Sequence, residues 1–66
     1  MTIRVNGEPV EIAAPMSLAA LLADLHIDPR RVAVEHNLRV VKRDRYETQQ
    51  VGAGDEIEIV NFVGGG

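Results

Sequence analysis

The chain has 66 residues, a formal net charge of −3, 45% hydrophobic and 26% charged residues, and no cysteine. This length predicts one small domain with a thin core, and the mixture of apolar and charged residues is typical of a globular chain. Disulfides, thiolate metal sites and a thiol nucleophile are excluded. The acidic balance argues against nucleic acid as a main partner, because phosphate binding needs a concentrated basic surface.

The start of the chain lacks the pattern of a secretory signal, and no apolar run reaches the length of a membrane span. Together with the lack of cysteine, this favours a cytoplasmic protein with no membrane partner.

A β-hairpin is the first predicted element. Thr2–Val5 alternates polar and apolar side chains, and Asn6-Gly7 follows, a dipeptide whose residues both tolerate the positive φ of a tight turn. The return strand carries Val10 and Ile12 on one face.

A helix is predicted next. Ser17 is placed to cap its first amides, and Met16 and Leu21 occupy the two positions of a hydrophobic staple. Pro29 is expected to stop it at Asp28, since the residue before proline avoids the helical region. Spacings of three and four residues place one apolar stripe against a sheet: Leu18, Leu21, Leu22 and Leu25.

The second half of the chain predicts three strands and a turn of helix. Residues 32–35 and 39–41 are the first two strands, and His36-Asn37 is expected to be a turn.

Residues 44–47 are expected to form one helical turn, with Asp44 as its cap, Glu47 at the reciprocal capping position and Tyr46 as an apolar anchor. Residues 52–55 then turn into a last strand, where Ile57 and Ile59 share a face.

This order predicts an α+β domain of the β-grasp type, a four- to five-stranded mixed sheet with one main helix on one face. We expect the domain to cover residues 1–62, and residues 63–66 to form a flexible glycine-rich tail.

The most informative segment is the end, Gly64-Gly65-Gly66. Glycine has no side chain to pack and is costly to order. Behind a strand, three glycines suit insertion of a free carboxylate into a narrow slot on another protein. A frayed terminus or a linker scar are the alternatives.

The β-grasp order, together with the closing residues 55–66, resembles the ubiquitin-like sulfur carriers of the ThiS/MoaD family, in particular the ThiS type of thiamin biosynthesis. The likeness covers the whole chain, but the part that is specific for this family is the C-terminal sequence Phe-Val-Gly-Gly-Gly. Three positions depart from it: Leu38 stands where such carriers often have glycine, Lys42 where proline is common, and Tyr46 where tryptophan is frequent.

The resemblance implies a protein substrate and carrier rather than an enzyme. An E1-like, ThiF-like adenylyltransferase would use ATP and magnesium to adenylate Gly66. A persulfide donor such as a cysteine desulfurase would convert the adenylate into a thiocarboxylate, and a ThiG-like thiazole synthase would receive the sulfur. Gly64 and Gly65 would thread into the partners. The chain itself has no phosphate-binding glycine loop, so no bound cofactor is expected.

Two acidic and two apolar residues beside the tail are candidates for docking. Glu56 and Glu58 would face basic residues of the activating enzyme, with solvent-facing strand alternation as the alternative. Phe62 and Val63 precede the glycines; Phe62 is expected in the core, with an exposed docking anchor as the alternative.

Other polar residues are given ordinary roles. The two histidines, His26 and His36, are expected at the surface with no metal, and His26 is placed to complement the dipole of the helix. The basic runs Arg30-Arg31 and 42–45 are expected to be solvated loop charges, with a specific contact surface as the alternative.

Three other functions remain open: a molybdopterin-synthase small subunit, a ubiquitin-like modifier joined to lysine through Gly66, and an interaction domain with an inert tail. A monomer is the simplest expectation.

Overall fold

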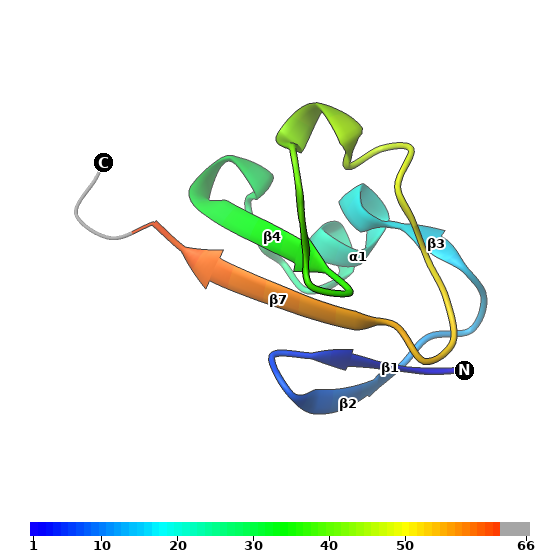
Figure 1. Ribbon diagram of the computed structural model, residues 1–66. Helices are drawn as coiled ribbons and strands as arrows, with labels where there is room; N and C mark the ends of the chain where they lie inside the picture. Colours follow the sequence, from blue (N-terminus) through cyan, green and yellow to red (C-terminus); the bar gives the residue numbers. More distant parts are fainter. Residues whose placement is uncertain (63–66) are drawn as a thin grey trace.

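The computed structural model of the protein describes residues 1–62. A five-stranded sheet in the order β2-β1-β7-β4-β5 carries one α-helix, and a small two-stranded sheet joins β3 to β6 (Figure 1). The elements are β1 (Thr2–Val5), β2 (Glu8–Glu11), β3 (Met16–Ser17), α1 (Leu18–Asp24), η1 (Pro29–Arg31), β4 (Val32–His36), β5 (Arg39–Val41), η2 (Arg43–Arg45), β6 (Gln50–Val51) and β7 (Glu56–Asn61), η marking a 3-10 helix.

The main sheet is mixed, as predicted. Strand β1 is antiparallel to β2 but parallel to β7, and β4 is antiparallel to both β7 and β5. Strand β7, the last along the chain, therefore lies at the centre of the sheet. The α+β, β-grasp prediction is confirmed, with five strands in the main sheet.

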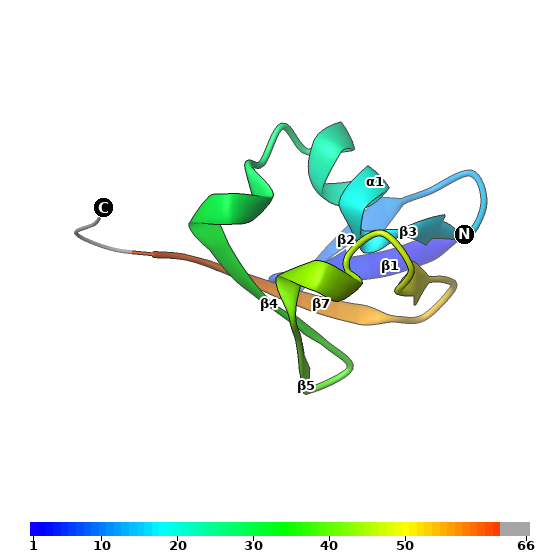
Figure 2. The same cartoon turned by 90° about the horizontal axis from the view of Figure 1, so that it is seen from above.

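The core lies between this sheet and α1, which covers one side of it (Figure 2). Alternation decides which side chains enter it: Ile57 and Ile59 of β7 are buried, and the glutamates between them are exposed. The buried hydrophobic residues of the described chain are Ile3, Ile12, Leu18, Leu21, Leu22, Val32, Val34, Tyr46, Val51, Ile57 and Ile59.

The start of α1 follows the prediction, and its end does not. The Ser17 Oγ accepts a hydrogen bond from the Ala20 amide at 3.0 Å, as expected for a cap. The helix ends at Asp24, earlier than the proline indicated, because His26 adopts a left-handed φ of 59°. The amides of His26 and Ile27 then bond back into the last turn at 3.0 and 2.9 Å, as in a Schellman motif. Asp28 caps η1 instead, accepting from the Arg30 amide at 2.9 Å.

One prediction for the segment 42–47 needs correction, and two short strands were not predicted. Helix η2 begins at Arg43 with Lys42 as its cap residue and no side-chain cap bond, so the assignment of Asp44 as the cap was wrong. Strands β3 and β6 were not predicted, because each has only two residues and depends on pairing with the other. The anchoring role of Tyr46 is confirmed, since its side chain is buried and its carbonyl accepts from the Ala19 amide at 2.9 Å.

The two hairpins of the main sheet use similar turns with different residues. Asn6-Gly7 has φ values of 51° and 82°, and Asn37-Leu38 has 51° and 70°. A left-handed conformation costs a residue with a Cβ roughly 1–2 kcal/mol, a cost that glycine avoids. Leu38 therefore holds its turn under strain, and its side chain is 85% exposed.

Replacing Leu38 with glycine is expected to raise the free energy of unfolding by about 0.5–1 kcal/mol, since relief of strain exceeds the added chain entropy. Urea denaturation of the variant against the unchanged protein measures this. The matched control is Gly7→Leu in the other hairpin, which should lose stability. Equal destabilisation by both changes would contradict a strained Leu38.

Candidate functional site

The candidate site is the C-terminal end of β7, at Asn61, and the sheet surface around it. Strand β7 is paired on both sides, and directly after it the Phe62 amide donates to the Arg31 carbonyl at 2.9 Å. The main chain is thus held up to the last residue that the structure describes. The predicted threading and modified residues, Gly64, Gly65 and Gly66, lie outside the described residues, as does Val63.

A second support for β7 comes from the turn of the first hairpin. The Asn6 Oδ1 accepts from the Ile59 amide at 2.7 Å, and its Nδ2 donates to the Ile59 carbonyl at 3.2 Å. The Asn6 amide itself donates to the Ile57 carbonyl at 2.8 Å. One side chain therefore continues the ladder between β1 and β7 where β1 has ended.

The side of the sheet opposite α1 carries both acidic and apolar side chains. Glu58 of β7 stands directly across from Glu35 of β4, which in turn stands across from Val40 of β5. Val60 stands beside Ala33. We call this set the open face: Ala33, Glu35, Val40, Glu56, Glu58 and Val60.

Several side chains of the open face lower the stability of the domain when no partner covers them. Val40 and Val60 are 75% and 60% exposed. Like charges directly opposite on neighbouring strands, as at Glu35 and Glu58, destabilise a sheet. Exposed valines around paired carboxylates are typical of a surface that meets another protein.

Phe62 is 64% exposed, so its expected place in the core was wrong and the docking alternative fits its position. Its ring borders a hollow of about 300 Å³ that is also lined by Pro29, Val32 and Tyr46. The chain leaves the sheet at Asn61, and the backbone bond to Arg31 then holds Phe62 beside η1 instead of under α1.

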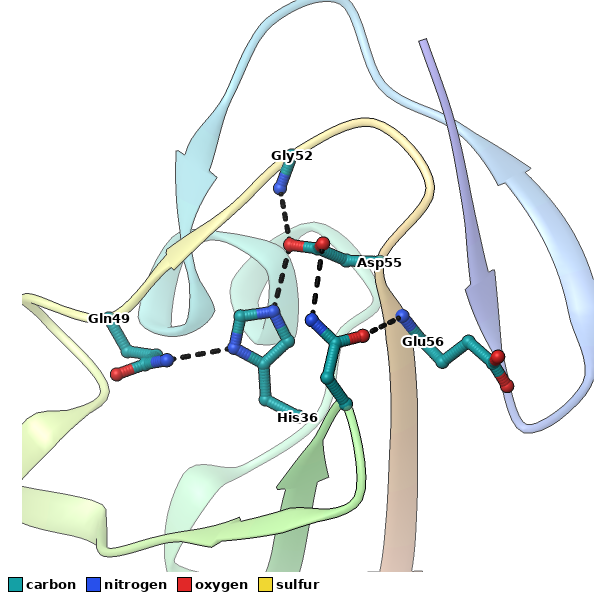
Figure 3. Close-up of polar contacts among 6 residues, drawn as sticks. His36, Gln49, Gly52, Asp55 and Glu56 are labelled. Atoms are coloured by element: carbon teal, nitrogen blue, oxygen red, sulfur yellow. Dashed lines mark hydrogen bonds and ion pairs between the residues drawn. The ribbon is translucent and has the colours of Figure 1, made fainter.

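His36 belongs to a buried polar network that was not predicted from the sequence. Its side chain is only 8% exposed, so its expected surface position was wrong. The His36 Nε2 lies 2.8 Å from the Asp55 Oδ2, and its Nδ1 lies 2.8 Å from the Gln49 Nε2 (Figure 3). In this arrangement the Gln49 amide donates to Nδ1, and Nε2 donates to the Asp55 carboxylate. The signal was present in the alternation of β4, which places His36 on the face of Val32 and Val34.

Asp55 joins this network to the turn before β7. Its Oδ2 also accepts from the Gly52 amide at 2.9 Å, and its Oδ1 accepts from the Asn37 Nδ2 at 3.3 Å. Asn37 in turn accepts from the Glu56 amide at 2.9 Å (Figure 3). Partial burial acts to raise the pKa of Asp55, but the hydrogen bonds from Gly52, His36 and Asn37 outweigh it, and the pKa is lowered.

Residues 1–62 contain no group of three or more histidine, aspartate or glutamate side chains arranged to hold a metal ion. Within the same residues, no helix has both the length and the apolar character needed to cross a membrane.

A family model described as the ThiS family matches residues 3–66, nearly the whole chain. The chain belongs to the ThiS family. It is 34% identical over 65 residues to the "Sulfur carrier protein ThiS" of Bacillus subtilis, covering 97% of this chain and 98% of that protein. The crystal structure of a thiamine biosynthesis protein (ThiS) from Geobacter metallireducens matches the fold of this ThiS-family chain with a TM-score of 0.88 and 33% identity, over 100% of both chains.

Other relatives of the ThiS-family chain are much longer. It is 46% identical over its full 66 residues to a "Thiazole synthase" of Paramagnetospirillum magneticum and 44% identical to one of Magnetococcus marinus. In both comparisons the chain spans only 20% of the relative's length.

Proposed function

We propose that this ThiS-family chain is a sulfur carrier of thiamin biosynthesis that transports sulfur on Gly66. The observation that carries the proposal is the family match, which extends through the final glycines. The likeness to the Bacillus subtilis sulfur carrier along nearly all of both chains supports it.

The proposed chemistry begins at the α-carboxyl group of Gly66. With a reference pKa of about 3.5 this group is a carboxylate at neutral pH, and a carboxylate is a poor acyl donor. Its attack on the α-phosphate of ATP forms an acyl adenylate and releases pyrophosphate. Sulfur from a persulfide then displaces AMP, and cleavage of the sulfur–sulfur bond by a thiol or other reductant leaves a thiocarboxylate. ATP, magnesium and the persulfide belong to partner enzymes, so the chain is a substrate and carrier.

The partners that we propose are an E1-like adenylyltransferase, a persulfide donor and a thiazole synthase. For the last of these, support comes from the two relatives named thiazole synthase, since each contains a segment similar to the whole chain. We propose that the open face and Phe62 dock on these enzymes while Gly64 and Gly65 enter the reaction site.

Intact mass measured on protein from its own host tests the proposal. A fraction heavier by one oxygen-to-sulfur exchange at Gly66 is expected. Complementation of a thiazole auxotroph then distinguishes thiamin supply from molybdopterin supply. An unmodified terminus together with failure to complement would overturn the proposal, and isopeptide-linked adducts would favour a protein modifier instead.

Reversing the charge of Glu56 and Glu58 with lysine is expected to lower kcat/KM for adenylation by the activating enzyme roughly tenfold, most strongly at low salt. Both carboxylates lie on the exposed side of β7. The control, Asp24→Lys with Glu47→Lys, changes the net charge equally at exposed positions off the open face. Equal loss in the two double variants would point to net charge alone and count against docking through β7.

A further inference from the structure

Positive charge is concentrated in one short segment of this acidic protein. Residues 39–45 contain four cationic side chains and one carboxylate, whereas the whole chain carries a net charge of −3. The segment comprises β5, η2 and the link between them, and β5 is an edge strand of the main sheet.

Three of these cations border a common hollow. Arg39, Lys42 and Arg45 line a depression of about 410 Å³ together with Val40, Val41, His36 and Gln49. Among the described residues, none of the three cations forms an ion pair. Arg30 and Arg31 differ, since both pair with Asp28, at 3.1 and 3.8 Å. Residues 42–45 are exposed, as expected for solvated charges, and Lys42 and Arg45 of this run also line the hollow with Arg39.

Hydrogen bonds to buried neighbours hold Gln49, a polar residue of the hollow, in place. Gln49 donates its amide to His36, which is buried and bonded in turn to Asp55 (Figure 3). This chain of hydrogen bonds fixes the Gln49 side chain, so the hollow has an ordered amide beside its cationic groups. Val41, which is half-buried and lies on the same side of β5 as Arg39, adds apolar surface.

The hollow and the carboxylates of the open face are on opposite sides of the sheet. Arg39 pairs in register with His36, whose side chain points toward α1. Glu35 and Glu58 alternate with buried residues and point the other way. The domain therefore presents positive charge on the helix side of its β5 edge and negative charge on the open face.

We propose that this hollow is a docking site for an acidic segment of a partner protein, in which carboxylates meet Arg39, Lys42 and Arg45 and an apolar side chain rests on Val41. Charge complementarity selects the acidic segment. Phosphate sites are usually built from backbone amides at glycine-rich turns or at the starts of α-helices. None of the described residues that line this hollow is a glycine, and the helix that starts at the hollow, η2, is a 3-10 helix of three residues. The inference goes beyond the sulfur-carrier function, because it adds a second contact surface whose charged groups lie on the other side of the sheet from the open-face carboxylates.

The test uses the full chain, isotopically labelled, and a synthetic peptide of glutamates flanking a single valine. Saturable NMR shifts are expected in residues 39–45 and in the side chains of Gln49 and His36. The peptide with glutamines in place of glutamates should give none. Lys42→Gln with Arg45→Gln is expected to weaken binding roughly tenfold, as for the loss of charged contacts, while preserving the amide spectrum of the core.

The control variant is Arg30→Gln with Arg31→Gln, which removes the same charge from exposed positions and should change the affinity less than about twofold. Three results would overturn the proposal: shifts spread over the whole surface, equal weakening in the two double variants, or tighter binding of inorganic pyrophosphate than of the peptide in the same hollow. The last would identify a small phosphate site. All three can be read without any sulfur transfer, so they are independent of the proposed carrier function.

Discussion

Replacing Gly65 with tryptophan is expected to abolish adenylation of Gly66 while leaving the midpoint of thermal unfolding unchanged. The indole would obstruct entry of the carboxyl end into a slot shaped for glycine. The described core has no member after Ile59, so the folded body should be unaffected. Release of pyrophosphate with the activating enzyme and scanning calorimetry measure the two effects.

The matched control introduces the same tryptophan side chain at a position away from the carboxyl end. A Cβ added at Gly52 would meet no heavy atom within 4 Å, and the residue has no positive φ, so Gly52→Trp should fold and be adenylated. Deletion of Gly66 should also abolish activity without changing the melting point. Retained adenylation of Gly65→Trp, or a large fall in its melting temperature, would contradict the proposed threading segment.

Replacing Asp55 with alanine is expected to lower the free energy of unfolding by about 2 kcal/mol, because donors lose their acceptor in a partly buried site. The His36 Nε2 and the Gly52 amide both donate to this carboxylate, and Asn37 adds a weaker contact. Urea denaturation measures the loss. Asp24→Ala removes an exposed carboxylate and should change stability by less than about 0.5 kcal/mol.

The same carboxylate gives the stability a dependence on pH. The pKa of Asp55 is lowered in the folded state, so the folded protein releases its proton more readily than the unfolded chain. Its stabilising contribution is present above the unfolded pKa of about 3.9 and is lost as pH falls through the folded value. The stability difference between the unchanged protein and Asp55→Asn should shrink below about pH 4. A difference that stays constant under acid would mean that the Asp55 charge does not matter.

Local patterns in the sequence predicted most of the framework. The turn at Asn6-Gly7, the cap at Ser17 and the leucine stripe of α1 each depend on residues close together in the chain. Pairing at long range was harder to foresee: β3 and β6 have two residues each, and neither pattern is distinctive without the other.

The errors at the candidate site have a common physical origin. His36 is a polar residue that is buried because distant Asp55 and Gln49 satisfy its ring nitrogens. Phe62 is an apolar residue that stays exposed because the chain has already left the sheet. Residue type favours the opposite environment in both cases. The hollow beside β5 was not predicted because its lining comes from separate parts of the chain: β5, η2, Gln49 and His36.

The parallel pairing of β1 with β7 has a practical consequence for every binding experiment described above. Because these neighbouring strands run in the same direction, Met1 lies at the end of the sheet remote from Phe62 (Figure 1). A fluorophore or surface-immobilisation handle attached through Met1 would leave the end of the sheet at Phe62 unobstructed. Among the described residues, it would displace the contacts of the terminal ammonium with the Ile12 carbonyl and with Glu11.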